Sequence, residues 1–96
     1  MIREDSMVTV SDDLTTADLG GEAIVLDVKS GNYFGLNEVG AFILECIRQP
    51  VSVREVIDRM LEEYDATREQ ITQDVVQFLQ QLQEQGLIRV TDERLA

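Results

Sequence analysis

The spacing of hydrophobic residues changes once along this chain, at Asn37. Before this residue, apolar side chains alternate in Glu22–Val28, which is the spacing of a half-buried strand. After it they recur every three or four residues as far as about Gln85, which is the spacing of amphipathic helices. The order of elements is therefore strands first and helices second. This order favours an α+β domain.

Short β-branched and alternating segments predict the strands. Met7–Val10 predicts a first strand, whereas Ser11–Gly21 is polar and predicts a loop. Glu22–Val28 and Asn32–Leu36 predict a hairpin with a two-residue turn at Ser30-Gly31. The alternation of the first hairpin strand places Ile24, Leu26 and Val28 on one face and Ala23, Val25 and Asp27 on the other.

Capping residues divide the second half of the chain into three helices. Asn37, Ser52 and Thr67 each stand where a side-chain oxygen accepts a hydrogen bond from the first helical turn. Ser52 and Glu55 form the pattern of a capping box, in which the glutamate reaches back to the first residue. The predicted helices run from Asn37 to about Ile47, from Ser52 to Tyr64 and from Thr67 to about Gln85, with Gly86 as the stop and Leu87–Val90 as a short last strand.

These elements fit one α+β domain over residues 7–90. We expect a winged-helix-like fold, in which three helices cover one face of a small antiparallel N-terminal sheet of two or three strands. The two ends, residues 1–6 and 91–96, are polar and predict flexible tails.

The residue types that carry most catalytic and metal chemistry are missing. The 96 residues include no histidine and one cysteine, Cys46, which stands on the apolar stripe of a predicted helix. A catalytic thiol needs a partly exposed setting that stabilises the thiolate, so we expect Cys46 to be a core residue. No pair among the 19 acidic residues is singled out as a general acid and base. We expect no enzymatic activity, no metal and no cofactor.

The net charge of the chain limits the kinds of partner that it can bind. A net charge of −11 repels nucleic-acid phosphates, whose binding depends on Lys and Arg displacing counterions. The same charge either attracts a basic peptide or only keeps the chain soluble. No apolar run reaches the roughly 20 residues needed to span a bilayer, and the charged first residues do not resemble a signal peptide. We expect a cytoplasmic protein with no nucleic-acid or membrane partner.

Two segments resemble the PqqD family. They are Val25–Gly40, which covers the hairpin and the first helical turn, and Asp74–Ile88, which covers most of the third helix and its stop. The resemblance rests on an ordered set of short features along nearly the whole domain. These are Leu36-Asn37, Tyr64-Asp65, Asp74-Val75 followed by Phe78-Leu79, and Gly86-Leu87-Ile88; Asn32-Tyr33-Phe34 is most similar to the stand-alone proteins of lasso-peptide biosynthesis.

The resemblance implies a recognition element for ribosomally made precursor peptides. Such proteins bind the leader segment of the precursor and deliver it to a modifying enzyme, which in lasso systems is a separate leader peptidase. The leader adds as a strand beside the third strand and against the third helix. The peptide-binding residues implied here are Lys29, Asn32, Tyr33, Phe34, Gly35, Leu36, Asp74, Val75, Val76, Leu79 and Gln83.

For several of these residues, a purely structural role is the alternative to peptide binding. Val76 widens the apolar arc of the third helix, so it either lines a groove or packs under the N-terminal loop. Asp74 either meets a basic leader residue or makes a structural hydrogen bond. Tyr33 and Phe34 take opposite faces, and we favour Tyr33 as the exposed one. Gly35 marks either a close approach of a ligand or a bulge.

Two other functions compete with peptide binding. A winged-helix domain can bind DNA, but the predicted third helix carries Arg68 as its single basic residue, whereas a recognition helix needs several phosphate contacts. A protein–protein adaptor without a peptide ligand is the other alternative.

Overall fold

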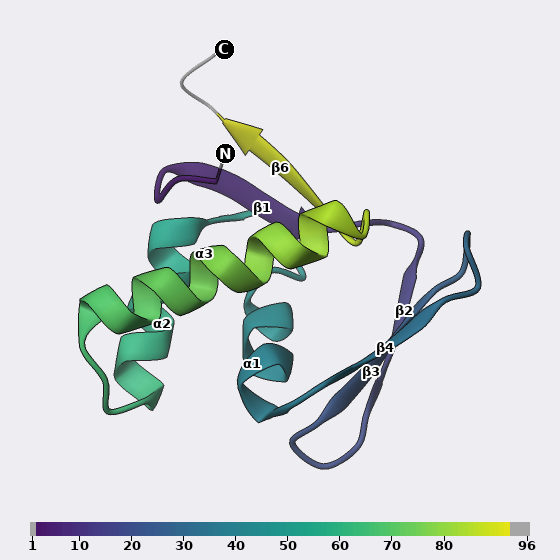
Figure 1. The fold of residues 1–96 in the computed structure, drawn as a ribbon, viewed down its shortest axis with the longest axis horizontal. Helices are drawn as coiled ribbons and strands as arrows, with labels where there is room; N and C mark the ends of the chain where they lie inside the picture. The colour runs from purple at the N-terminus through teal and green to yellow at the C-terminus, as the bar shows by residue number, and fades with distance from the viewer. Residues whose placement is uncertain (1, 93–96) are drawn as a thin grey trace.

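The structure is a computed structural model that describes residues 2–92. Figure 1 shows strands at the beginning of this range, helices in its second half, and a strand at its end. The elements are β1 (Ser6–Val10), β2 (Leu14–Asp18), β3 (Ala23–Asp27), β4 (Tyr33–Leu36), α1 (Glu38–Cys46), β5 (Val51–Ser52), α2 (Val53–Glu63), α3 (Arg68–Glu84) and β6 (Ile88–Asp92).

The strands form two antiparallel sheets of three strands each, in the orders β5-β1-β6 and β2-β3-β4. The α+β class and the order of strands and helices are thus confirmed, whereas the expected single winged-helix-type sheet is wrong. The reason is that β1 pairs with the distant segments β5 and β6, in the register Val8↔Val51 and Val8↔Val90. In Figure 1, α1 lies between the β2-β3-β4 sheet and helices α2 and α3.

Strand β2 occupies part of the segment that was predicted to be a loop, Ser11–Gly21. It pairs with β3 from Leu14↔Asp27 to Asp18↔Ala23. The sequence hides this strand because it lies at a sheet edge, where only Leu14 and Thr16 are half-buried. Pairing with β3, and not burial of its own side chains, holds the segment extended.

The helices begin at the predicted caps. The side chains of Asn37, Ser52 and Thr67 each accept a hydrogen bond from a backbone N–H in the first turn. Gly86 follows α3 with φ of 74°, which glycine adopts at little cost. The second half of the predicted capping box is wrong: the Glu55 carboxylate binds the Arg59 guanidinium one turn further along the helix.

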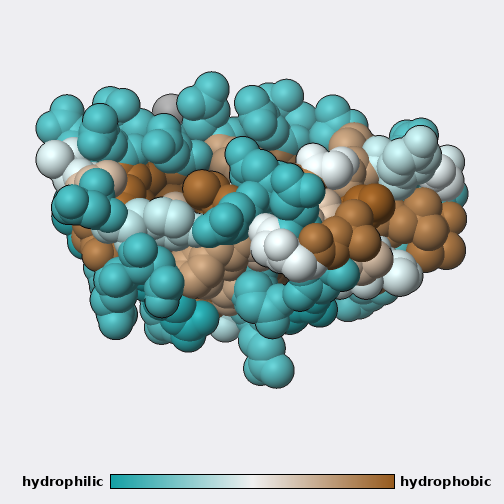
Figure 2. Space-filling model, turned by 90° about the horizontal axis from the view of Figure 1, so that it is seen from below, coloured by the Kyte–Doolittle hydropathy of each residue, from teal (hydrophilic) through white to brown (hydrophobic). Residues whose placement is uncertain are grey.

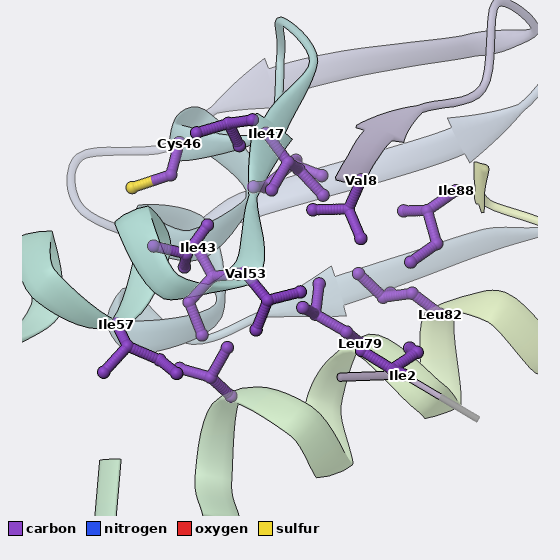
Figure 3. Packing of buried hydrophobic residues seen from close by; sticks show 14 of the residues in the cluster. Ile2, Val8, Ile43, Cys46, Ile47, Val53, Ile57, Leu79, Leu82 and Ile88 are labelled. Carbon is purple, nitrogen blue, oxygen red and sulfur yellow. The ribbon is translucent and has the colours of Figure 1, made fainter. Parts of the chain in front are cut away.

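The core lies between the helices and the inner faces of both sheets, and Figure 3 shows its side chains interlocking. Cys46 is 8% exposed and belongs to this core, as predicted. Residues 1–6 were predicted to be a flexible tail, but Ile2 is 4% exposed within the core and Ser6 begins β1. Of the predicted tail 91–96, residues 91 and 92 belong to β6 and the rest lies outside the described range.

No other element within residues 2–92 covers the outer face of the β2-β3-β4 sheet. Ile24 and Leu26 are 36% and 38% exposed there, whereas Val25 between them is 1% exposed. Figure 2 shows hydrophobic residues gathered at the right-hand end of the molecule, where Figure 1 has this sheet. The large hydrophobic residues that are exposed on β3 and its flanking turns are Leu19, Ile24, Leu26 and Val28.

Candidate functional site

Strand β4 lies at an edge of its sheet, because β3 is its one neighbour among the described strands. The backbone N–H of Asp27 donates to the carbonyl of Asn32 over 2.8 Å, so these two residues stand at a hydrogen-bonded position of the ladder. Such pairs alternate along an antiparallel ladder, so Phe34 bonds to β3. Tyr33 and Gly35 therefore turn their N–H and C=O groups toward the open edge, where an added strand can bind them.

The side chains of β4 divide between the two faces of the sheet. Phe34 and Leu36 point inward and are half-buried against the core. Tyr33 lies on the outer face opposite Leu26 and is 74% exposed, so the exposed aromatic residue is the one that we favoured. A Cβ atom at Gly35 would meet nothing within 4 Å, and the unbroken register of β4 excludes the bulge.

The tip of the β3–β4 hairpin is organised by Asp27. Its carboxylate accepts hydrogen bonds from the Lys29 N–H over 3.1 Å and from the Ser30 hydroxyl over 3.0 Å. Gly31 has φ of 79° and donates its N–H to the Asp27 carbonyl. The connection is longer than the predicted two-residue turn, because the Asp27 side chain replaces part of the backbone pairing. Lys29 and Asn32 are exposed on this tip.

Helix α3 turns one face to the core and has a flank on each side of it. The core face consists of the four buried residues Ile71, Val75, Leu79 and Leu82. Phe78 borders this face on one side and Val76 on the other, at roughly 160° from each other around the helix at 100° per residue. We define the Phe78 flank as Asp74, Phe78 and Gln81, and the Val76 flank as Thr72, Val76 and Gln83.

The Phe78 flank is the side of α3 that meets the end of β4. A Cβ atom at Gly40 would lie 3.2 Å from Cζ of Phe78 and 3.4 Å from Cβ of Leu36. The Phe78 ring therefore packs close to the backbone of α1, one turn after β4 ends. Gly40 permits this approach because it has no side chain.

The predicted residues of the third helix are distributed over all three sides. Asp74 is exposed on the Phe78 flank, one helical turn before Phe78. Val75 and Leu79 are 0% exposed and belong to the core face, so they support the surface from beneath. Val76 is half-buried and Gln83 is exposed, both on the Val76 flank. The structure thus places Asp74 on the same flank as Phe78, and Val76 and Gln83 on the opposite side of the helix.

Two residues of this site, Phe78 and Gly40, were not among the predicted binding residues. Helical periodicity places Phe78 beside the core face, and the residue is half-buried at the border of that face. The sequence signal for this contact was Gly40 itself, because a glycine lowers the stability of a helix and leaves room for another side chain to approach the backbone.

The Cys46 thiol is the remaining reactive side chain that the sequence singles out. Burial raises the pKa of the Cys46 thiol, and the nearby Arg59 guanidinium offsets this only in part. Within residues 2–92, no group of three or more Cys, Asp or Glu side chains is arranged to hold a metal ion. Of the helices in the same range, none has the length and hydrophobicity of a membrane-spanning segment.

Comparison with known proteins adds a family and two solved structures. The chain is similar to TbiB1 in complex with the TbiA(beta) leader peptide, with 28% identity, a TM-score of 0.80, and coverage of 84% of this chain and 94% of that one. It shares its fold with lasso peptide synthetase B1 complexed with the leader peptide, with 23% identity, a TM-score of 0.76, and coverage of 85% and 96%. No curated protein matches it in sequence. Residues 22–88 match the family of coenzyme PQQ synthesis protein D, and the chain therefore belongs to the PqqD family.

Proposed function

We propose that this protein binds the leader segment of a ribosomally synthesised precursor peptide as an added strand along β4. The observation that carries the proposal is the open edge of β4, where Tyr33 and Gly35 present their backbone groups beside the Phe78 flank of α3. Adding a strand satisfies these groups, and pockets on either side of the peptide select its side chains. A protein of the same fold, 28% identical, forms a complex with a leader peptide.

The binding surface that we propose has two parts. The strand part is Lys29, Asn32, Tyr33, Phe34, Gly35 and Leu36, with Tyr33 and Gly35 supplying the backbone bonds. The helix part is Asp74 and Phe78, supported from the core by Val75 and Leu79. Val76 and Gln83 contribute only if the peptide continues across the helix to its other flank.

The role that fits this surface is recognition without catalysis. The chain has no histidine, and its cysteine is a buried thiol whose pKa is raised by burial. Arg68, the basic residue of α3, is bound by the carboxylates of Asp58 and Glu4 over 2.9 Å each, which hold its pKa above the usual range. This guanidinium is therefore committed within the protein, which argues against α3 as a DNA-recognition helix.

We further propose that the protein works in lasso-peptide biosynthesis and delivers its leader to a separate leader peptidase or other modifying enzyme. The support is the fold that the chain shares with lasso peptide synthetase B1 and its coverage of 94% of the similar leader-binding chain. A delivery role requires two interactions on different surfaces, one for the leader and one for the enzyme.

An amide NMR titration with a synthetic cognate leader peptide tests the binding surface. We expect the largest shifts at residues 29–36 and along the Phe78 flank of α3. The same titration with duplex DNA at physiological salt should produce no shifts, because the protein carries a net charge of −11. Leader shifts that fall mainly on α1 and α2 would show that the site lies elsewhere.

A further inference from the structure

A concave site that includes no residue of β4 lies on the inner face of the β2-β3-β4 sheet. It is a pocket of about 440 Å³ between the inner side of β2 and β3, helix α1 and the end of α2. We name it the acidic pocket and define it by Asp18, Ala23, Glu38, Phe42, Glu63 and Tyr64. Ala41 also lines it, and its small side chain leaves part of this space open.

The pocket combines an aromatic wall with uncompensated negative charge. The rings of Phe42 and Tyr64 meet edge to face, with centroids 5.8 Å apart and an interplanar angle of 87°. Glu45 is neutralised by Arg48, whose guanidinium also donates to the Thr16 hydroxyl over 2.9 Å. The other three carboxylates of the pocket form no ion pair within residues 2–92; they belong to Asp18, Glu38 and Glu63.

The pKa of the Tyr64 hydroxyl reflects the negative charge of the pocket. Burial raises the pKa of the Tyr64 hydroxyl, and the carboxylates of Glu38 and Glu63 raise it further. Both carboxylates therefore act on the aromatic wall, where a negative phenolate is disfavoured and a positive group is favoured. A cation placed against the ring would gain from the same charges that disfavour the phenolate.

We propose that the acidic pocket binds an arginine side chain of a partner protein. A guanidinium is planar, lies flat on an aromatic ring, and donates five hydrogen bonds, so it can use the aromatic wall and several carboxylates together. An ammonium group is a compact, strongly hydrated charge and makes less use of the rings. The surrounding net charge of −11 adds attraction during encounter.

The proposed partner is the enzyme that receives the leader, and this part rests on the proposed function. The pocket is built from β2, β3, α1 and the end of α2, whereas the leader is proposed to lie on β4 and α3. Two strand spacings, about 10 Å, separate β2 from β4 across the sheet. One surface can therefore hold the enzyme while the other holds the peptide.

The test uses N-acetyl-arginine amide as a probe and N-acetyl-citrulline amide as its uncharged counterpart of the same shape. In an amide NMR titration, we expect the arginine probe to shift Gly21, Ala41, Phe42 and Tyr64, which line the pocket, and the citrulline probe to leave them in place. The double variant Glu38→Gln/Glu63→Gln should bind the arginine probe roughly fivefold more weakly, as expected for the loss of two exposed ion pairs.

Three comparisons decide the outcome. Glu62→Gln removes a neighbouring exposed charge that does not line the pocket, and it should leave the shifts unchanged. Ala41→Leu fills the pocket and should abolish them while circular dichroism stays native. The double variant should still bind the leader peptide with unchanged affinity, which separates this proposal from the proposed function. Equal shifts with citrulline, or arginine shifts centred on other acidic surfaces, would overturn the arginine site.

Discussion

The two sheets of this protein differ in how deeply the residues of their central strands are buried. In the β5-β1-β6 sheet, β1 has no exposed residue, and Val8 at its centre is 1% exposed. In the β2-β3-β4 sheet, β3 buries Val25 to the same degree but leaves Ile24 and Leu26 more than a third exposed. The first sheet is part of the core, whereas the second is a platform whose outer face and β4 edge are free among the described residues. We infer that stability resides in the first and recognition in the second.

The strongest challenge to this division is a substitution beneath the site. Leu79 is 0% exposed and packs in the core behind the Phe78 flank. Leu79→Ala should lower the free energy of unfolding by about 3 kcal/mol, because it removes buried methyl groups and leaves a cavity. Chemical denaturation measures this loss. Tyr33→Ala is the control on the platform, and it should change stability little because the side chain is 74% exposed. A comparable loss in both variants would break the comparison.

A proline at the edge of β4 tests the platform itself. Gly35→Pro removes an N–H that faces the open edge, whereas Phe34→Pro removes one that bonds to β3. We expect Gly35→Pro to fold and to bind the leader about tenfold more weakly, which corresponds to about 1.4 kcal/mol. Phe34→Pro should instead destabilise the hairpin. Calorimetric titration with the leader and thermal unfolding together separate the two effects; unchanged binding by Gly35→Pro would exclude strand addition at this edge.

The two flanks of α3 can be compared directly. Phe78→Ala should weaken leader binding about fivefold, because the ring meets Gly40 beside the end of β4. Val76→Ala removes an aliphatic group of the opposite flank and should leave the affinity nearly unchanged. Both residues are half-buried, so thermal unfolding should accompany the fluorescence binding assay to separate binding from stability. A larger effect at Val76 would assign the peptide to the Val76 flank.

The smallest effect is expected at Cys46. Cys46→Ala should cost about 1 kcal/mol or less of stability, because the thiol is a small core group. Leader binding and the activity of a reconstituted leader peptidase should be unchanged. Since burial raises the pKa of this thiol, the folded protein should also react with iodoacetamide more slowly than the unfolded chain. Loss of turnover in a correctly folded variant would contradict the non-catalytic role.

Sequence patterns predicted the parts of the fold that depend on local chemistry. The N-caps Asn37, Ser52 and Thr67 hold because a short polar side chain bonds a nearby amide in its own turn. The sheet arrangement depends instead on pairing between distant segments, as between β1 and β6, which no local pattern encodes. Edge strand β2 was missed for another reason: only two of its five residues are half-buried, so its hydrophobic alternation is weak.

The sequence predicted the strand part of the candidate site but not the side of α3 that belongs to it. The alternation of Tyr33 and Phe34 indicates which aromatic residue is exposed once the inner face is known. For α3, periodicity identifies a wide apolar arc but not which border of the arc faces β4. The contact between Gly40 and Phe78 decides that question, and it arises from the packing of α1 against α3.

The shortness of β4 limits how tightly backbone bonding alone can hold a peptide. Tyr33 and Gly35 offer at most about four hydrogen bonds at the open edge, and each contributes about 1 kcal/mol net. Four such bonds reach about 4 kcal/mol, which corresponds to a Kd of only about 1 mM. Any affinity in the micromolar range or below must therefore come from side chains of the leader, so that discrimination among precursors and retention of the correct one depend on the same contacts.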